Sequence, residues 1–234
     1  MSTEKMVGPI YAVIRYLLKI FFNLLYHQFT WTYDWVAELV SLGRWKSWVY
    51  SVLPYLENSK VLELGCGPGH LQLALWRKKS STFGIDSSRS MVRLAVAQLI
   101  KNSQPANIVQ GKAQHLPYPD RSFNKVVATF PSDFISDYET LSQAWRILDD
   151  SGELIILPAA WITGKYWWDK FAAWTFRITG QAPIIDALDN FEGNQIYPLS
   201  DLQEIGFQIS TEIIELDSSK LILIHAEKMI PEKH

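Results

Sequence analysis

A glycine-rich segment followed by an acidic residue is the part of this sequence best suited to bind a ligand. The segment is Glu63-Leu-Gly-Cys-Gly-Pro-Gly69, which follows a short apolar run and precedes a helical pattern. Glycine adopts positive φ readily, and without a Cβ it lets the backbone approach a ligand closely. The start of a helix also offers unpaired N–H groups. We therefore expect a small polar ligand at this turn.

Asp86 supports the same expectation because it ends the next apolar run, 17 residues after Gly69. In dinucleotide-binding folds, an acidic residue at this place accepts the hydroxyls of a ribose. The glycine spacing differs from the G-x-G-x-x-G of nicotinamide enzymes. The alternative is an incidental turn with an exposed aspartate, and the presence of both features makes it much less favourable.

The elements that position these residues alternate regularly from Lys60 onward. Apolar runs of strand length alternate with helical patterns, which is typical of a parallel sheet with helices on both faces. The predicted strands are 61–64, 81–85, 107–110, 125–130 and 152–157, and the predicted helices are 70–79, 88–101 and 136–148. A capping box at 200–203 predicts a short helix that ends at Gly206. We expect 207–216 and 220–228 to form an antiparallel hairpin after it.

The composition sets broad limits on function. The chain has 234 residues, of which 48% are hydrophobic and 20% charged, as expected of a globular protein with a substantial core. A net charge of −2 gives no reason to expect a nucleic-acid partner. Cys66 is the single cysteine, which excludes an intramolecular disulfide and suits a reducing cytoplasm. No His, Cys and Asp cluster has the spacing of metal ligands.

Two segments rich in apolar and aromatic residues lie outside this regular core. In residues 10–29, polar side chains recur every four residues and include Arg15 and Lys19. A membrane span would bury both cations at about 2.5–3.5 kcal/mol each, so a helix lying in the membrane interface fits better. Residues 163–179 gather Trp and Phe on one helical side, with Lys and Arg mainly on the other. For each segment, packing against the rest of the protein is the alternative.

These patterns predict the domain organisation. Residues 1–50 are expected to form an N-terminal amphipathic extension and lid. Residues 51–234 are expected to form the main domain, with a helical insert on the substrate side at 158–198.

The glycine segment resembles the first motif of class I S-adenosylmethionine (SAM)-dependent methyltransferases almost letter for letter. Residues 111–124, GKAQHLPYPDRSFN, resemble the G-D-A-x-x-L-P-F-x-D-x-S-F-D stretch of the ubiquinone/menaquinone-methyltransferase-like group, also called methyltransferase type 11. The match covers about 60–157. The resemblance implies SAM as the cofactor and an α/β, Rossmann-like sheet of seven strands with helices on both faces. Its implied strand order is 3-2-1-4-5-7-6, with strand 7 antiparallel.

The resemblance also implies roles for individual residues. The turn residues would line the methionine moiety, Glu63 would hold its amino group, and Asp86 would bind the ribose. Beside the adenine would lie Ser87 and the backbone of Ala113. The full set of cofactor-binding residues expected on this basis is Tyr33, Glu63, Gly65, Cys66, Gly67, Gly69, Asp86, Ser87, Ala113, Gln114 and Phe130. Tyr33, from a Tyr-Asp element upstream of the motif, is equally well explained as a structural residue.

Lys112 departs from the family pattern. It stands where the family has an aspartate that binds the adenine amino group, and a lysine cannot accept a hydrogen bond. Gln114 is the nearest substitute acceptor. Asn124 likewise replaces the aspartate of the family's second Phe-Asp pair.

The chemistry of methyl transfer makes modest demands on side chains. It is an in-line displacement, which positioning and desolvation can promote, and a base is needed only when the nucleophile must lose a proton. Asp133 and His115 are the expected catalytic residues, although each is also explained as a surface polar residue.

We therefore expect a methyltransferase that acts on a hydrophobic or amphiphilic acceptor at the membrane surface. The acceptor would be an isoprenoid quinol precursor or a phospholipid head group. The protein would be cytoplasmic and peripheral on the inner face of the cell membrane, contacting it through 10–29 and 163–179. One alternative is a soluble methyltransferase with an aromatic lid around a small molecule. Another is a non-catalytic binding protein that keeps the fold.

Overall fold

The structure, a computed structural model, describes Ser41 and residues 43–163 and 199–229. The predicted helix at 10–29, Tyr33 and almost all of the 163–179 segment lie outside these residues. Two compact units are distinguished in the chain. The described part of the larger one comprises 46–158, 199–214 and 221–229, and that of the smaller one comprises Ser41, 43–45, 159–163 and 215–220. The domain boundary expected at 50/51 stays a prediction.

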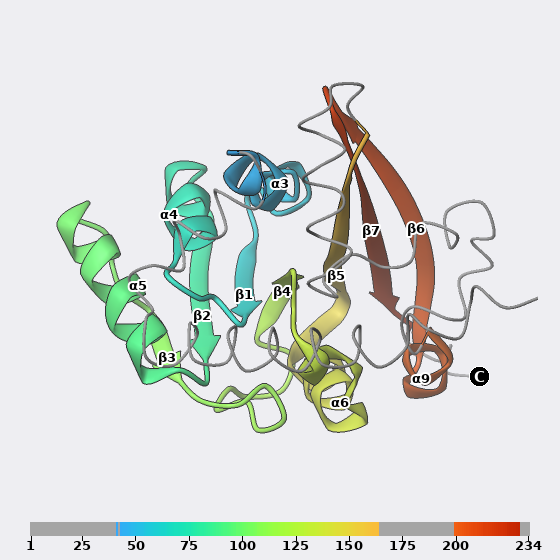
Figure 1. Ribbon diagram of the computed structural model, residues 1–234. Helices are drawn as coiled ribbons and strands as arrows, with labels where there is room; N and C mark the ends of the chain where they lie inside the picture. Colours follow the sequence, from blue (N-terminus) through green and yellow to red (C-terminus); the bar gives the residue numbers. More distant parts are fainter. Residues whose placement is uncertain (1–40, 42, 164–198, 230–234) are drawn as a thin grey trace, which may run out of the picture. The chain divides into compact units, whose positions relative to one another are not determined.

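A seven-stranded sheet of order β3-β2-β1-β4-β5-β7-β6 forms the centre of the fold (Figure 1). This order confirms the arrangement implied by the sequence resemblance. Strands β3, β2, β1, β4 and β5 pair in parallel with one another. The strands are β1 Lys60–Leu64, β2 Ser81–Asp86, β3 Ile108–Gln110, β4 Phe123–Thr129, β5 Leu148–Ile162, β6 Phe207–Leu216 and β7 Ser219–Lys228.

The register of the central strands brings their carboxyl ends together. Leu64 pairs with Ile85, and Glu63 pairs with both Gly84 and Val127. The last four residues of β1 are all buried, as expected of a strand covered on both faces. The turns that follow β1, β2 and β4 therefore meet at one edge of the sheet, where open α/β sheets bind their ligands.

Helices and short 3-10 turns cover this sheet. They are α3 Trp45–Tyr50, η2 Leu53–Tyr55, α4 His70–Arg77, α5 Arg89–Lys101, η3 Asp133–Ser136, α6 Tyr138–Ile147 and α9 Leu199–Ile205. Helices α4 and α5 pack against each other and against β2, α5 also packs against β3, and α6 contacts α9 and η3 (Figure 1). Ser88 caps α5, since its hydroxyl accepts a hydrogen bond from the Met91 N–H at 3.4 Å.

The structure corrects three details of the predicted elements. Strand β5 has 15 residues and continues through Pro158 to Ile162, well beyond the predicted 152–157. The predicted capping box is wrong, because α9 already includes Leu199 and Ser200 therefore lies inside the helix. Phe130 lies outside β4 rather than at its end, because the strand stops at Thr129 and Phe130 has φ +47°.

The described part of the smaller unit is held by local hydrogen bonds and one ion pair. The N–H of Thr163 donates to the Ser218 carbonyl at 2.8 Å, and Lys220 pairs with Glu215 at 2.7 Å. The Trp45 N–H donates to the Ser41 hydroxyl at 2.9 Å.

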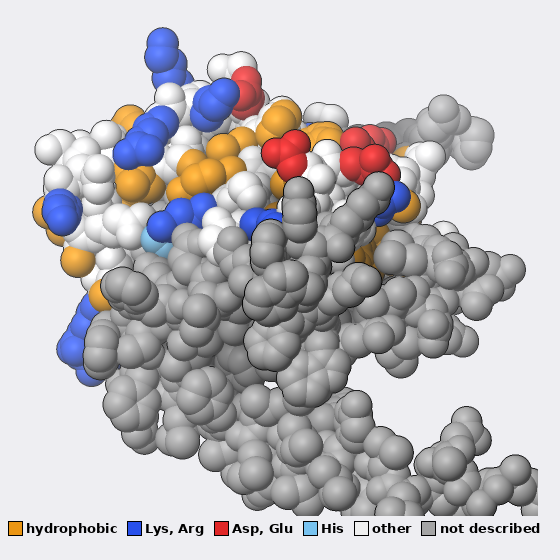
Figure 2. All heavy atoms as spheres, turned by 45° about the horizontal axis from the view of Figure 1, so that its top comes forward, with side chains coloured by type: hydrophobic (Ala, Val, Ile, Leu, Met, Phe, Trp, Pro, Cys, Tyr) orange, Lys and Arg blue, Asp and Glu red, His pale blue; other side chains and the backbone are white. Residues whose placement is uncertain are grey.

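The described surface shows no segment built to cross a membrane. Among the described helices, none is long and apolar enough for a transmembrane span. On the face drawn in Figure 2, hydrophobic side chains form a patch, with basic side chains mostly to its left and acidic ones to its right.

Candidate cofactor site

The glycine turn between β1 and α4 forms an open surface of backbone. The N–H groups of Gly65 and Cys66 both donate to the Ile85 carbonyl, at 2.8 and 3.1 Å, which fixes the turn to the end of β2. Gly67 has φ +49°, and a Cβ placed on it would meet no atom within 4 Å. A ligand can therefore approach the main chain directly at Gly67.

At Gly69, a glycine is needed for helix packing rather than for ligand access. Its φ is +84°, and a Cβ there would lie 3.0 Å from the Ala95 Cβ and 3.1 Å from the Ala95 Cα in α5. Gly69 thus allows the start of α4 to pack closely on α5, and it occupies the N-cap position of α4. The two glycines serve ligand access and helix packing, respectively.

Asp86 connects the two turns at this edge of the sheet. Its Oδ2 accepts from the Gly67 N–H at 2.9 Å, and its Oδ1 accepts from the Ser88 N–H at 2.8 Å. Asp86 is only 2% exposed. Because each carboxylate oxygen can accept two hydrogen bonds, these contacts are compatible with further donors such as the hydroxyls of a sugar.

Glu63 belongs to a buried polar chain beneath the turn. Gln72 of α4 donates from Nε2 to Glu63 Oε2 at 2.8 Å, and its Oε1 accepts from the Thr82 hydroxyl. All three side chains are buried. Burial, with a smaller contribution from nearby Asp86, raises the pKa of Glu63 to about 8, although the hydrogen bond from Gln72 acts in the opposite direction. The carboxyl group is therefore mostly protonated at neutral pH.

Cys66 packs inside the turn. Its side chain lies against β2, where a Cβ on Gly84 would come within 3.0 Å of the Cys66 sulfur. Burial raises the pKa of the Cys66 thiol well above its usual value, so the thiol is a poor nucleophile. Within the described residues, no group of three His, Cys, Asp or Glu side chains could hold a metal ion.

Aromatic side chains surround the methionine end of the expected site. Phe130 keeps its positive φ while its N–H donates to the Leu157 carbonyl at 2.7 Å, and its ring lies 6.2 Å from that of Trp48. The Phe134 ring of η3 covers the turn, since a Cβ on Gly65 would lie 3.3 Å from it. Backbone strain of this kind concentrates at functional sites. Trp48 and Phe134 were not predicted, because neither belongs to a spacing pattern in the sequence.

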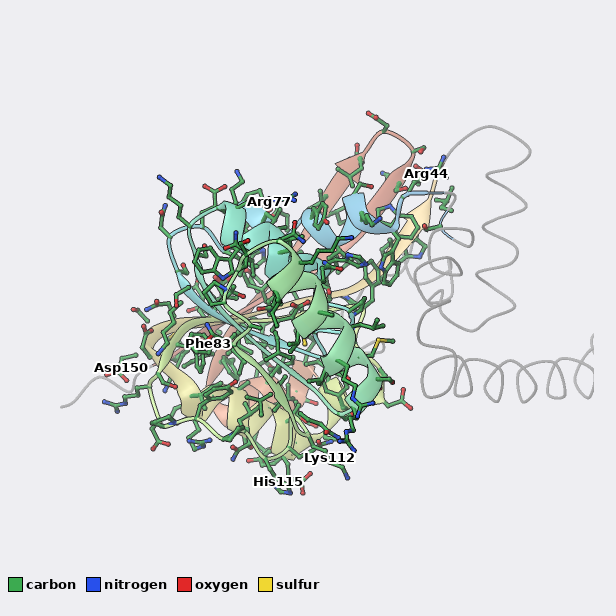
Figure 3. All side chains as sticks on the ribbon, turned by 90° about the vertical axis from the view of Figure 1, so that its left-hand side faces the viewer. Arg44, Arg77, Phe83, Lys112, His115 and Asp150 are labelled. Atoms are coloured by element: carbon green, nitrogen blue, oxygen red, sulfur yellow. The ribbon has the colours of Figure 1, made fainter. Side chains whose placement is uncertain are left out.

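The loop after β3 forms the other end of the site. The Gly111 N–H donates to the Asp86 carbonyl at 3.0 Å, which ties this loop to the end of β2. Ala113 is buried, and Gln114 donates from Nε2 to Asp137 Oδ2 at 2.5 Å. Lys112 and His115 are exposed and lie at the same edge of the molecule (Figure 3).

The structure thus brings together most of the predicted residues, but not all of them. The turn residues, Glu63, Asp86, the 111–114 loop and Phe130 surround the carboxyl ends of β1, β2 and β4. Ser87 is exposed at the start of α5, and Asp133 is exposed on η3. His115 lies beside Lys112, on the side of the 111–114 loop rather than on η3. Tyr33 lies outside the described residues.

Comparison with known proteins defines the class to which this site belongs. Residues 61–152 match the family described as methyltransferase domain. Together with the strand order and the turn after β1, this match indicates a methyltransferase-like domain whose fold is similar to that of SAM-dependent methyltransferases.

The curated relatives are more specific in their names. The chain is 27% identical over 191 residues to demethylmenaquinone methyltransferase of Thermotoga maritima, covering 79% of this chain and 80% of that one. It is 28% identical to the Lactobacillus johnsonii enzyme of the same name, over 59% of this chain and 62% of that one. A ubiquinone/menaquinone biosynthesis C-methyltransferase of Bartonella quintana is 25% identical, over 65% and 63% of the two chains. The chain thus spans about three fifths of the length of the latter two.

Solved structures agree on the fold. A SAM-dependent methyltransferase from Aquifex aeolicus superposes with a TM-score of 0.54 at 16% identity, over 76% of this chain and 88% of that one. A SAM-dependent methyltransferase described as putative, from Methanococcus maripaludis, gives a TM-score of 0.58 at 20% identity, over 87% and 93% of the two chains.

Proposed function

We propose that this protein transfers the methyl group of SAM to an isoprenoid quinol precursor at a membrane surface. The observation that carries the proposal is the open glycine turn at Gly67, which lies beside the buried carboxyl groups of Glu63 and Asp86. The names of the relatives from T. maritima, L. johnsonii and B. quintana support a quinone precursor as the acceptor.

The arrangement of the described residues supports SAM as the ligand of this site. In the proposed arrangement, Glu63 binds the amino group, the turn around Gly65 and Gly67 lines the methionine chain, and Asp86 binds the ribose hydroxyls. Each carboxyl group already has fixed protein donors, which hold it in place before the ligand arrives. SAM supplies an electrophilic methyl group on a sulfonium. The positive charge of a sulfonium also suits aromatic rings such as Phe130.

The adenine end is assigned to the 111–114 loop. The Ala113 N–H would donate to the ring edge, and Gln114 would accept from the amino group in place of the family aspartate. Ser87, at the start of α5, would lie beside the ring, and Cys66 would support the turn from below. Tyr33 keeps its proposed place over the methionine end on the basis of sequence alone.

A base is required only if the acceptor must lose a proton. Asp133 is the better-placed of the two proposed residues, because it begins η3 shortly after the carboxyl end of β4. The 111–115 loop, which carries His115, is tied to β2 and to the adenine end. If a base acts, we therefore propose that Asp133 accepts the proton, with His115 as the second candidate.

The amphipathic patterns of 10–29 and 163–179 are the reason for proposing that the protein acts at a membrane surface. A cytoplasmic protein that lies on the inner face of the cell membrane would reach an acceptor with an isoprenoid tail without extracting it from the bilayer. A phospholipid head group is the second acceptor chemistry that this location would allow. The competing functions are a soluble methyltransferase with an aromatic lid and a non-catalytic binding protein that keeps the fold and uses it for partner contact.

A methylation assay tests the proposal. The purified full chain is incubated with methyl-labelled SAM and a total lipid extract, and the labelled product is identified by mass spectrometry. We expect the label in a quinone-type lipid. A labelled phospholipid would identify the second acceptor, and label only in a small soluble molecule would favour the soluble enzyme. If the folded protein shows no detectable binding of SAM in a calorimeter, the non-catalytic alternative gains support.

A further inference from the structure

A hydrogen bond between two distant segments fixes the orientation of one amide at the adenine end. Gln114, in the loop after β3, donates from Nε2 to Asp137 Oδ2 at 2.5 Å. A carboxylate has no hydrogen to donate, so the NH₂ end of the Gln114 amide must face Asp137. The carbonyl oxygen Oε1, which lies in the same amide plane, consequently points away from Asp137.

Asp137 is well suited to hold this orientation. It directly precedes α6, yet its side chain makes no capping hydrogen bond to the helix, so its carboxylate is available to Gln114. Its own N–H donates to the Phe134 carbonyl at 3.2 Å, which fixes the residue relative to η3. Both Gln114 and Asp137 are partly buried, where a fixed hydrogen bond is stronger than in water.

The rest of the loop lacks a comparable acceptor side chain. Lys112 offers only N–H donors, and it lies exposed at the edge seen in Figure 3. The side chain of Ala113 has no polar atom. An adenine bound beside this loop would present a donor, its 6-amino group, next to an amide whose oxygen is held ready to accept.

We infer that Asp137 is a positioning residue that makes the cofactor site specific for a 6-amino purine. By holding the NH₂ end of Gln114, it aims the amide oxygen at the 6-amino group and repels a purine with an oxygen at that position. Selectivity of this kind arises because a fixed acceptor facing another acceptor leaves both without a partner. This inference rests on the proposed SAM site and deepens it.

The test compares the binding of two unreactive ligands by calorimetry, S-adenosylhomocysteine and S-inosylhomocysteine, which has oxygen in place of the 6-amino group. The full chain is compared with Asp137→Asn, Gln114→Ala and Glu139→Gln. Asparagine keeps the size of aspartate but can present either a donor or an acceptor to Gln114, so that the glutamine amide can flip. Glu139→Gln is the matched control, because it removes one negative charge from the first turn of the same helix.

We expect the parent protein to prefer the adenine ligand. In Asp137→Asn, S-inosylhomocysteine should bind about three to ten times more tightly than in the parent, the range of one hydrogen bond. Gln114→Ala should weaken S-adenosylhomocysteine by a similar factor, and Glu139→Gln should keep the parent's preference. A role for Asp137 in folding alone would not improve the binding of any ligand, and melting temperatures of all variants check for folding.

Two results would overturn this inference while leaving the proposed cofactor site in place. One is an unchanged preference in Asp137→Asn, and the other is equal affinity of the parent for both ligands. A folded parent that binds neither ligand would instead remove the proposed cofactor site, and the inference with it.

Discussion

At the scale of single residues, Glu63 combines two properties that rarely coexist. It is 3% exposed, and yet it carries a group that is charged in water. Its hydrogen bond from Gln72 satisfies one oxygen but does not offset the cost of desolvating a charge, so the pKa rises to about 8. A positively charged ligand group next to Glu63 would reverse this balance, because it stabilises the ionised form.

Cofactor binding should therefore release a proton from Glu63. In the free protein, the group is protonated below pH 8, whereas the proposed complex with an ammonium group needs the carboxylate. We expect the affinity for S-adenosylhomocysteine to rise between pH 6 and 7.5, by up to about tenfold per pH unit for one released proton. Calorimetry in buffers with different ionisation enthalpies measures the proton release directly. A flat profile in the parent protein would contradict the proposed role.

Glu63→Gln provides the control for this prediction. It should bind the ligand at least about tenfold more weakly, with no pH dependence in the same window, because the loss of a charged partner costs about 1.5–3 kcal/mol. Its stability should not fall. The raised pKa of Glu63 means that the parent loses stability as the pH rises from about 4.5 to 8, and glutamine removes this loss.

The sequence identified single residues only where they form a local pattern. Gly67 and Asp86 could be predicted because the turn and the strand end give them fixed spacing, whereas the role of Glu63 followed only from the family resemblance. Gln114 was predicted as the acceptor that substitutes for the family aspartate, whose place Lys112 takes. Its partner Asp137 is 23 residues away, and only the fold brings the two side chains together. Phe134 and Trp48 likewise reach the turn through tertiary packing, which no periodicity in the sequence reveals.

At the scale of elements, the glycine turn separates ligand access from helix packing. Gly69→Ala would place a Cβ against the main chain of Ala95 at positive φ, and should cost about 2–5 kcal/mol of unfolding free energy. Gly67→Ala meets open space, so its cost should be only about 1–2 kcal/mol from the backbone conformation. Urea unfolding measures both values.

Ligand binding should distinguish the same two variants. Gly67→Ala places a methyl group on the surface that the cofactor is proposed to contact, so it should weaken S-adenosylhomocysteine strongly while remaining folded. Equal losses of stability in the two variants would show that the packing of Gly69 on α5 contributes little.

A second group of charged residues connects strands β4, β5, β7 and β6, toward the end of the sheet opposite β3. His225 of β7 is hydrogen-bonded through Nδ1 to Glu153 of β5 at 2.5 Å, and Nε2 lies 3.5 Å from Glu212 of β6. Glu153 also pairs with Lys125 of β4, and Tyr55 donates to Glu212 at 2.8 Å. Hydrogen bonding to Glu153 raises the pKa of His225, while His225 and Lys125 lower that of Glu153 despite its burial.

This cluster should make stability depend on pH. The contribution of His225 is fully present below its unfolded pKa of about 6.5 and is lost as the pH rises through the higher folded value. We expect His225→Gln to lower the unfolding free energy more at pH 6 than at pH 9, measured by urea unfolding. A constant effect of His225→Gln across this range would contradict the charge coupling.

The elements themselves were predicted well where apolar runs are bounded by turn residues. Strands β1 and β2, helix α5 and the terminal hairpin follow that rule. The length of β5 was missed for two reasons. Its first residues, Leu148-Asp-Asp-Ser151, are mostly polar and join the sheet around an irregularity opposite Phe123 and Lys125. The predicted strand stopped at Leu157, whereas β5 continues through Pro158, and a proline is tolerated where its missing N–H is not needed for pairing.

At the scale of the whole molecule, the membrane proposal depends on the segments that flank the methyltransferase domain. None of the described helices is long and apolar enough to span a membrane. The proposed attachment rests on the amphipathic sequence patterns of 10–29 and 163–179. The protein should therefore sediment with liposomes that contain anionic lipid, and a deletion of 1–28 should reduce the bound fraction several-fold, in proportion to the apolar area removed. Equal and negligible pelleting of both proteins would contradict the membrane proposal.

Cys66 has a practical consequence for studying this turn. It is the single thiol of the chain, and it is enclosed between the turn and Gly84. A thiol reagent can reach it only when the turn opens, so the labelling rate reports the frequency of that opening without any engineered probe. The natural sequence thus carries its own reporter of motion at the proposed cofactor site.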